Sequence, residues 1–330
     1  MGILLAVFAA ALPRIAGYGD VWAVLQGLRA SQLGLLGALT VVALGAYAAI
    51  FAVLLPGVRL HTALAVHMAS TAVAFTVPAG GAVATGVTFS LYRARGVRSE
   101  RVLAAMATAG LWELIARLAL PVAAAVSLAV TGEGRRWWAL AAVAMAMLSA
   151  LLGAAAAASR SARFARTLGT WLGRPLSWAQ TRRGKPPVDG ASAAEDLRLE
   201  VLRTVGGHWT AVSALTIGGH VAQAVLLLAS LRVLGVPATQ VGIGAVLTAY
   251  ALARSATALP VTPGGVGVVD LGLVAILAVT AGEEHAARIA AAVLVFRGLT
   301  YVAPILLGLV AWLVLRASAW RSASPTSSDP

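Results

Sequence analysis

The chain alternates between long apolar runs and short segments rich in arginine, glycine and proline. An α-helix rises about 1.5 Å per residue, so about 20 apolar residues cross the roughly 30 Å hydrocarbon core of a bilayer. Runs of this length occupy residues 33–55, 102–130, 138–158, 209–234 and 286–315. The pattern predicts an all-α polytopic membrane protein that forms a single integral-membrane domain over residues 1–330.

Two further apolar runs are interrupted by proline and glycine. Residues 62–91 are split around Pro78, and residues 238–281 are split around Pro263. Neither break can continue a helix, so each run predicts two half-length helices that meet at a re-entrant turn. Backbone N–H and C=O groups that lack helical hydrogen bonds at membrane depth are tolerated only where protein buries them or where they line a water-filled cavity. Interrupted helices in both halves of a chain therefore point to a binding site.

The order of these elements occurs twice along the chain. A span, a broken hairpin and a long helix that carries an arginine and a proline follow one another over residues 33–130 and again over residues 209–316. Because residues 138–158 add one crossing between the two copies, the second copy is expected to sit upside down relative to the first. This predicts an inverted structural repeat with two breaks that face each other across the midplane.

One long polar segment, residues 160–207, lies between the two copies. It contains nine lysines and arginines, and loops of this charge stay in the cytoplasm. The segment and the C-terminus are therefore predicted to be cytoplasmic, in a multi-pass protein of the cell (plasma) membrane. Arginines mixed with tryptophans over residues 160–178 favour a helix on an anionic membrane surface. The tail, residues 321–330, is predicted to be disordered.

The N-terminal region does not form a complete span. Residues 1–12 are apolar but short, and they lack the positive segment of a signal peptide. They are interpreted as a truncated first span, and one explanation is a true start upstream of Met1. Residues 20–30 are amphipathic and are predicted to lie at the membrane interface.

Composition supports a membrane protein and excludes several kinds of site. Hydrophobic residues make up 60% of the chain and charged residues 11%, with a mean hydropathy of +0.87. The chain contains no cysteine, so disulfides, thiolate metal sites and a cysteine nucleophile are excluded. The net charge of +13 is carried mostly between apolar runs. Contact with anionic lipid headgroups explains this placement better than nucleic-acid binding.

Five ionisable side chains lie inside or beside the predicted apolar segments, where a charge at a helix centre costs about 2.5 to 3.5 kcal/mol. Glu113 and Arg117 are four residues apart and either neutralise each other or place Arg117 at a lipid phosphate, with Glu113 steering it. Asp270 and Arg297 either pair across the second hairpin or act separately. In that case Arg297 contacts the phosphate, and Asp270 contacts a cationic headgroup or a coupling proton. Arg254 is either an interfacial residue or, as is favoured here, a gate to the cavity.

The residues of the two breaks offer a further anion site. The first N–H groups of a helix have no partner within the helix, and the helix dipole is positive there. An anionic group is therefore expected at helix starts that follow each break, although close helix packing also explains glycine at these positions. The residues concerned are Pro78, Gly80, Gly81, Thr262, Pro263, Gly264 and Gly265.

No motif predicts a catalytic centre. Residues 265–270 give part of a dinucleotide fingerprint, without its third glycine or a βαβ context. Residues 283–288 match the Glu-Glu-x-x-x-Arg motif of membrane-embedded prenyl-protein proteases, but no histidine follows His285 to activate water. The histidines lack metal-ligand spacing with acids, and no phosphate-binding Gly-x-x-x-x-Gly-Lys loop occurs. The sequence therefore predicts no enzyme activity, cofactor or metal.

One family resemblance is carried by the second break. The sequence Leu-Pro-Val-Thr-Pro-Gly-Gly-Val-Gly-Val-Val-Asp ends at Asp270, and Phe-Arg-Gly-Leu-Thr-Tyr follows at residues 296–301 with Pro304 after it. These residues resemble the signature of the lysylphosphatidylglycerol synthase/flippase integral-membrane family, over about residues 33–315. The resemblance implies movement of lipids such as aminoacylated phosphatidylglycerol between leaflets. Members that also synthesise the lipid carry a soluble aminoacyltransferase domain after the membrane region, so translocation without synthesis is expected here.

Two positions depart from the family pattern. Asp270 stands where the family usually has glutamate, and residues 82–85, Ala-Val-Ala-Thr, stand where many members have a polar residue and an arginine. A substrate other than an aminoacyl phospholipid therefore stays open, such as another anionic phospholipid or a related lipid.

Three functions are consistent with the sequence. A flippase or scramblase would pass an anionic headgroup between the two hairpins, with membrane phospholipids as its partners. A polytopic enzyme acting on a polyprenyl-phosphate or lipid donor would need acids in an outward loop, for which Asp20, Glu133, Glu283 and Glu284 are available. A non-transporting partner of an envelope-lipid synthase would dock through residues 160–203. No nucleic acid is expected as a partner. The sequence does not decide whether the chain forms a homodimer.

Overall fold

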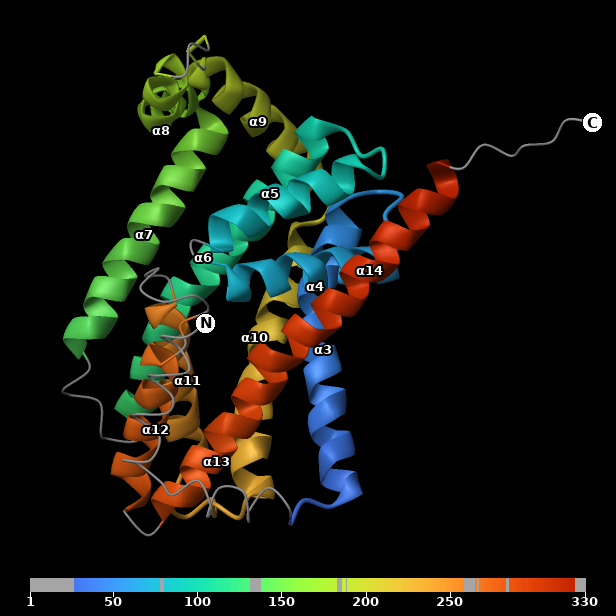
Figure 1. Ribbon diagram of the computed structural model, residues 1–330. Helices are drawn as coiled ribbons and strands as arrows, with labels where there is room; N and C mark the ends of the chain where they lie inside the picture. The colour runs from blue at the N-terminus through green and yellow to red at the C-terminus, as the bar shows by residue number, and fades with distance from the viewer. Residues whose placement is uncertain are drawn as a thin grey trace, which may run out of the picture.

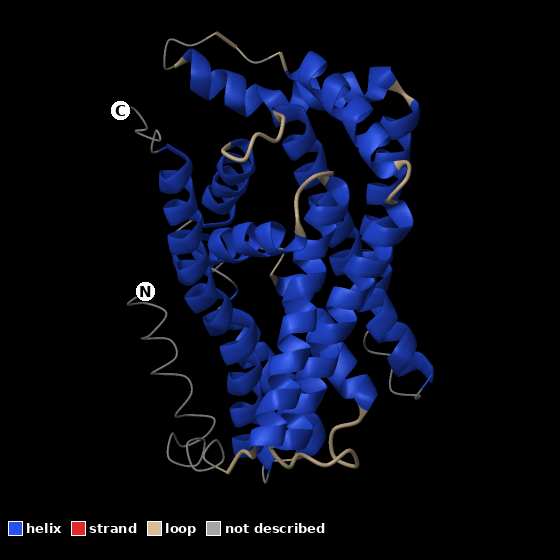
Figure 2. Cartoon of the chain, turned by 90° about the vertical axis from the view of Figure 1, so that its right-hand side faces the viewer, coloured by secondary structure: helices blue, strands red, loops and turns tan. Residues whose placement is uncertain are grey.

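The computed structural model describes residues 27–77, 80–130, 138–182, 186–187, 189–257, 265, 267–282 and 285–323. Within these ranges the regular secondary structure is entirely helical, as Figure 2 shows. The predicted all-α class is therefore confirmed for the described part of the chain. The predictions for residues 1–12, for most of residues 20–30 and for residues 324–330 of the tail lie outside the described residues. The first three residues of the predicted disordered tail, 321–323, are helical, because the last helix continues to Ala323.

Most of the helices follow the predicted apolar runs. They are α3 (Ala30–Leu54), α4 (Leu60–Thr76), α5 (Gly80–Arg93), α6 (Ser99–Val130), α7 (Trp138–Arg160), α8 (Ala162–Thr181), α9 (Gly190–Val205), α10 (Trp209–Val233), α11 (Ile243–Ala256), α12 (Val268–Ala281), α13 (Ala286–Arg297), the π-helical η5 (Gly298–Val302) and α14 (Ala303–Ala323). Four described segments are long and apolar enough to cross a membrane: Ala30–Leu54, Ser99–Ala125, Trp209–Val233 and Ala286–Leu315. The last of these joins α13, η5 and α14. The predicted span at residues 138–158 lies in α7 and is not among the four, because its described part, Met145–Arg160, qualifies only together with Ala162–Pro175 as a pair of helices bent by 117°.

Proline and glycine account for where the helices end. After α3 ends at Leu54, Pro56 removes a backbone donor and Gly57 takes a φ of 91°. After α10 ends at Val233, Gly235 takes a φ of 77°. This left-handed region is open to glycine and disfavoured for other residues, so both glycines stop helical continuation.

Both predicted breaks separate two helices that pack against each other. One lies between α4 and α5, and the other lies between α11 and α12. In Figure 1 the outer ends of α4 and α5 lie at the end of the molecule that carries α8 and α9, whereas the outer ends of α11 and α12 lie at the opposite end. Of the predicted break residues, Pro78, Thr262, Pro263 and Gly264 lie outside the described residues.

The polar segment predicted as a loop is largely helical. It forms α8, which overlaps the predicted surface helix, and α9, which the sequence did not predict. The two helices meet at Gly169 and Gly190, where a side chain on either residue would collide with the facing backbone. Small residues at the contact therefore let the two backbones approach closely and fold the segment onto itself.

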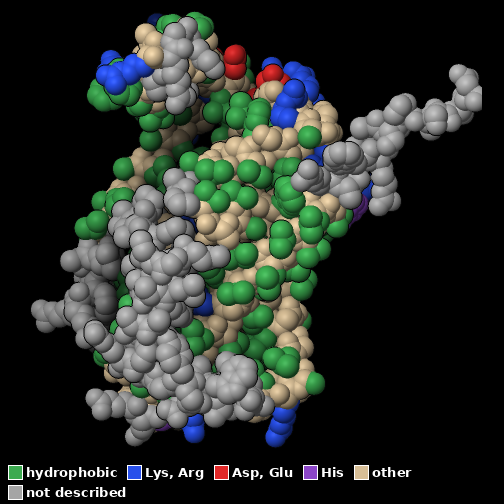
Figure 3. Space-filling view, viewed as in Figure 1, with side chains coloured by type: hydrophobic (Ala, Val, Ile, Leu, Met, Phe, Trp, Pro, Cys, Tyr) green, Lys and Arg blue, Asp and Glu red, His purple; other side chains and the backbone are tan. Residues whose placement is uncertain are grey.

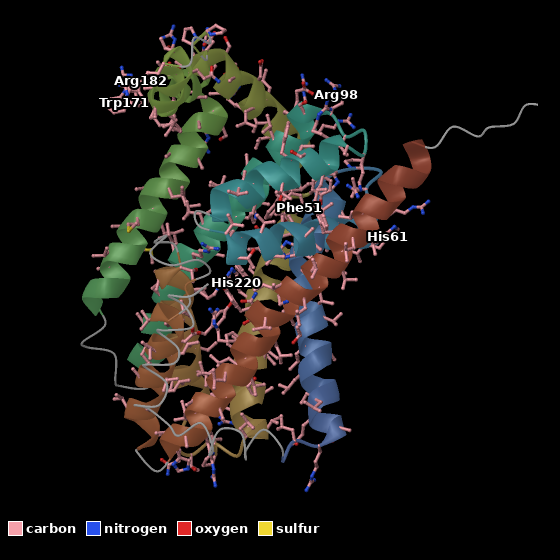
Figure 4. The ribbon with its side chains drawn as sticks, in the orientation of Figure 1. Phe51, His61, Arg98, Trp171, Arg182 and His220 are labelled. Atoms are coloured by element: carbon pink, nitrogen blue, oxygen red, sulfur yellow. The ribbon has the colours of Figure 1, made fainter. Side chains whose placement is uncertain are left out.

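The α8 helix presents aromatic side chains beside arginines. Trp171 and Trp178 are 65% and 60% exposed. The guanidinium of Arg174 lies 5.0 Å from the Trp171 ring centroid, and that of Arg182 lies 4.0 Å from the Trp178 ring centroid. Figure 4 shows Trp171 and Arg182 together on the outer side of this end. Such cation–π pairs suit a helix whose aromatic face enters a membrane surface.

Two buried apolar clusters hold the helices together. One lies in the second half and includes Leu226, Leu277 and Ile289, and the other lies in the first half and includes Ile50 and Val66. The halves also pack on each other, because α3 lies along α10 and α14 lies along α4. Apolar side chains cover much of the face in Figure 3, and most visible lysines and arginines lie at its two ends. This distribution is typical of a membrane protein.

Candidate functional site

Glu113 on α6 is the centre of a buried charge network. Its Oε1 accepts hydrogen bonds from Arg117 Nε at 2.9 Å and from Arg254 Nη2 at 2.8 Å. Its Oε2 lies 3.3 Å from His220 Nε2. Arg117 is one helical turn away on α6, whereas Arg254 comes from α11 and His220 from α10. One carboxylate from the first half therefore holds two side chains of the second half.

A second layer of polar groups supports this network. His220 Nδ1 lies 2.9 Å from the Tyr250 hydroxyl oxygen, and the Tyr250 hydroxyl donates to Gln223 Oε1 at 3.2 Å. Ser255, next to Arg254, donates from its hydroxyl to the carbonyl oxygen of Arg117 at 3.0 Å. Figure 4 places His220 near the middle of the molecule. Buried polar groups are stabilising when their partners are present, so these bonds fix the orientation of the charged side chains.

Asp270 and Arg297 form a separate ion pair in the second half. Arg297 Nε lies 2.5 Å from Asp270 Oδ1. Asp270 Oδ2 accepts a hydrogen bond from the backbone N–H of Gly267 at 2.8 Å, at the start of α12. The carboxylate therefore neutralises a buried cation and also satisfies one of the N–H groups that a helix start leaves without a helical partner.

A cavity of about 1000 Å³ lies beside both charge clusters. Its lining comes from both halves and contains the first residues of α5, the end of α11, Gly265 and the η5 region. The charged residues in the lining are Glu113, Arg117, Arg254 and Arg297. Together with Asp270 behind Arg297, three guanidinium groups face two carboxylates, which leaves a net charge of +1. Such a cavity favours an anionic ligand.

An aromatic contact joins the two halves at the cavity wall. The rings of Phe75 on α4 and Tyr301 in η5 stack with centroids 4.5 Å apart. The Tyr301 hydroxyl donates to the carbonyl oxygen of Phe75 at 2.8 Å, and the Arg297 guanidinium lies 4.9 Å from the Tyr301 centroid. The C-terminal end of α4 is therefore connected through Tyr301 to the ion pair of Asp270 and Arg297.

Two glycines of the predicted site allow the backbone to come close at the cavity. A side chain at Gly80 would collide with the carbonyl group of Ala74, so glycine permits α5 to start against the end of α4. Gly265 has a φ of +70°, and a side chain there would also collide with Val269. Gly80, Gly81 and Gly265 all line the cavity. Close backbone packing, shown for Gly80 and Gly265, and a position in the candidate site therefore do not exclude each other.

The π-helical turn after Arg297 has a local cause. The backbone N–H of Ala303 bonds to the carbonyl oxygen of Gly298, five residues earlier. Pro304 has no N–H and cannot make the next α-helical bond, so the chain widens by one residue before α14. Single π-turns of this kind occur frequently at functional sites.

The structure places most predicted site residues together. Seven of them line the cavity: Gly80, Gly81, Glu113, Arg117, Arg254, Gly265 and Arg297. Asp270 reaches the same region through Arg297. Of the pairings left open by the sequence, the structure contains both the Glu113 pair with Arg117 and the Asp270 pair with Arg297.

Sequence reasoning missed the residues that connect the halves. The interpretation of Arg254 did not include its bond to Glu113, and His220, Gln223 and Tyr250 were not assigned to the site. One signal was available, because His220 and Gln223 are three residues apart in the middle of an apolar span. Polar side chains at that depth call for partners.

Within the described residues, no group of three histidine, aspartate or glutamate side chains is arranged to hold a metal ion. Comparison with known proteins gives one result at the level of the family. The sequence model for the lysylphosphatidylglycerol synthase TM region matches residues 1–308. No curated protein matches the chain.

Proposed function

Because this chain belongs to the lysylphosphatidylglycerol synthase transmembrane-region family, we propose that it moves an anionic or aminoacylated phospholipid, or a related lipid, between membrane leaflets. Membership and the apolar helices make it a membrane protein connected with lipids. The proposal adds a specific activity, translocation as a flippase or scramblase. In this activity the lipid is not covalently changed.

The proposed path lies between two re-entrant hairpins, α4 with α5 and α11 with α12. Their outer ends lie at opposite ends of the molecule (Figure 1), as expected of an inverted repeat. Their inner ends contribute Gly80, Gly81, Thr257 and Gly265 to one cavity. In this arrangement a headgroup would cross the midplane through the cavity while its acyl chains stay in the surrounding lipid.

We place the protein in the plasma membrane. In the proposed orientation, the end of the molecule that carries α8 and α9 faces the cytoplasm. The nine lysines and arginines of residues 160–207 support this direction under the positive-inside rule. The C-terminal end of α14 lies toward the same end of the molecule in Figure 1. The first hairpin would then open from the cytoplasm and the second from the outside.

The carboxylate of Glu113, shared by two arginines, is the observation that carries the proposal. Arg117 and Arg254 share a single carboxylate oxygen of Glu113. A lipid phosphate offers several acceptor oxygens and could take one guanidinium while Glu113 retains the other. Binding would thus replace one charged hydrogen bond with another, so the cation need not pass through an unpaired state.

The test is a headgroup-accessibility assay in reconstituted liposomes, with fluorescent phosphatidylglycerol and lysyl-phosphatidylglycerol compared with phosphatidylcholine. Arg254→Gln should slow translocation about tenfold or more, since a charged hydrogen bond contributes roughly 1.5 to 3 kcal/mol. Arg203→Gln is the control, because Arg203 is exposed and lies outside the cavity lining. Equal rates in the two variants, both folded, would contradict the proposal. Lipid-dependent product formation would instead support the enzyme alternative.

A further inference from the structure

A second cavity lies between two loops at the α8 and α9 end. It has a volume of about 500 Å³ and is formed where the connection from α3 to α4 meets the connection from α5 to α6. Among the described residues, it shares no lining residue with the central cavity. The ionisable residues that line it are Arg59, His61, Arg95, Arg98 and Arg101. Figure 4 shows Arg98 and His61 on this side of the molecule.

The charge of this pocket is largely uncompensated. Among the described residues that line it there is no aspartate or glutamate. Glu100 lies 3.5 Å from Arg98, but both side chains are more than half exposed, at 57% and 71%. An ion pair this exposed contributes little. Four guanidinium groups therefore surround a concave space with one weakly held counter-charge nearby.

The backbone leaves N–H donors beside the arginines. Two helices start at this pocket, α4 directly after Arg59 and α6 directly after Arg98. Two other helices end beside it, α3 at Leu54 and α5 at Arg93, so the dipoles of the four helices largely offset one another. The first N–H groups of α4 and α6 have no helical acceptor and can donate to an anion with several oxygen acceptors, while the guanidinium groups supply the positive charge.

Apolar neighbours point to a lipid as the source of that anion. Leu55 and Val58 line the pocket beside the arginines, and Leu60, at the first turn of α4, is 53% exposed. On its other side α4 packs along α14, whose apolar side chains include Leu306 and Leu309, 61% and 57% exposed. A ligand with a phosphate at the loops and acyl chains along these helices would match both surfaces.

We propose that the pocket formed by Arg59, Arg95, Arg98 and Arg101 binds the phosphate of an anionic phospholipid headgroup in the adjoining leaflet, at a site separate from the central cavity. Arginine suits this ligand because its fork of N–H donors matches phosphate oxygens. The site holds a lipid next to the outer ends of α4 and α5. It does not depend on the translocation activity proposed above.

The experiment measures lipid association with the full chain in phosphatidylcholine nanodiscs that contain spin-labelled phosphatidylglycerol. Arg59→Gln/Arg98→Gln removes two pocket cations. Arg203→Gln/Arg288→Gln removes two exposed cations that lie neither in the pocket lining nor in the α8 surface helix, so the net charge is matched. A charge-assisted hydrogen bond to the phosphate is worth about tenfold in affinity, so the pocket variant should bind roughly tenfold or more weakly. The control loses no such bond and should change by less than about twofold. Circular dichroism and gel filtration check folding.

Three outcomes would overturn the proposal. Equal loss in both double variants would mean general attraction to the charged surface, and no loss in the pocket variant would mean that the arginines do not hold the lipid. In a third arm, inorganic phosphate and glycerophosphoglycerol compete with the labelled lipid. Full displacement by either at millimolar concentration would identify a soluble phosphate as the ligand. Because binding is the readout, these results are independent of any measured flipping.

Discussion

Glu113 and Asp270 are both buried acids beside arginine, yet they hold the molecule together differently. Glu113 contacts Arg117 on its own helix and Arg254 and His220 from the other half. Asp270 contacts Arg297, which is also in the second half, and it accepts a hydrogen bond from the backbone N–H of Gly267 at the start of its own helix. Glu113 therefore connects the halves, whereas Asp270 stabilises one half internally. If the halves move apart during transport, the bond from Arg254 to Glu113 must break, while the Asp270 pair can move as a unit.

Replacing Glu113 is expected to give the largest effect. Glu113→Gln leaves Arg117, Arg254 and His220 without the carboxylate that holds them, and breaking a buried ion pair in this way costs about 3 to 5 kcal/mol. The free energy of unfolding, measured by circular dichroism during titration with sodium dodecyl sulfate, should fall by about 3 kcal/mol. A fall below about 1 kcal/mol would show that Glu113 does not hold the halves.

Asp270→Asn should have a smaller effect in the same titration. Asparagine keeps an oxygen that can accept from Gly267 N–H, but it loses the charge that neutralises Arg297. We expect a loss of about 2 kcal/mol, within the range of a charged hydrogen bond and below that of a broken buried pair. A loss equal to or greater than that of Glu113→Gln would reverse the ranking of the two acids.

Double-mutant cycles test whether the coupling crosses the halves. Combining Glu113→Gln with Arg254→Gln should give a coupling energy of about 1 to 2 kcal/mol, because the side chains are in direct contact. The matched cycle of Asp270→Asn with Arg254→Gln should give about 0.5 kcal/mol or less. Similar coupling in the two cycles would indicate one shared network, and the distinction between the acids would be wrong.

Asp189 provides an exposed acid for comparison, with the smallest expected effect. Its carboxylate accepts hydrogen bonds from the Ser192 hydroxyl and from the backbone N–H groups of Ser192 and Ala191, and these bonds lower its pKa. Because the folded-state pKa is depressed, its stabilisation is present above the unfolded-state pKa of about 4 and is lost as pH falls through the folded-state value. The difference in unfolding midpoint between wild type and Asp189→Ala should therefore shrink on acidification. A constant difference would contradict a role for its charge.

The sequence was informative where structure depends on near neighbours. Pro56 and Gly57 indicated the end of α3, and the spacing of Glu113 and Arg117 indicated their pair. The proline and glycine breaks indicated where α4 is separated from α5 and α11 from α12. Each of these features is set by residues a few positions apart. The local signals therefore predicted four of the membrane spans and the Glu113 pair with Arg117.

Contacts between distant segments could not be predicted in this way. Arg254 and Glu113 are 141 positions apart, and nothing in the local pattern selects one as partner of the other. The packing of α8 on α9 likewise depends on Gly169 meeting Gly190 across a turn. A residue's depth in a span can show that it needs a partner, but only the fold determines which one it finds.

The wide turn at η5 also sets how two faces of one long helix are aligned. An added residue shifts the phase of everything beyond it by about 100° relative to a regular α-helix. Before the turn, Arg297 is directed at Asp270, and after it Gly308 fits against the backbone of Met68. A regular α-helix of the same sequence would make one of these contacts and rotate the other residue away. The π-turn before Pro304 therefore lets one continuous helix contact Asp270 with one face and α4 with another.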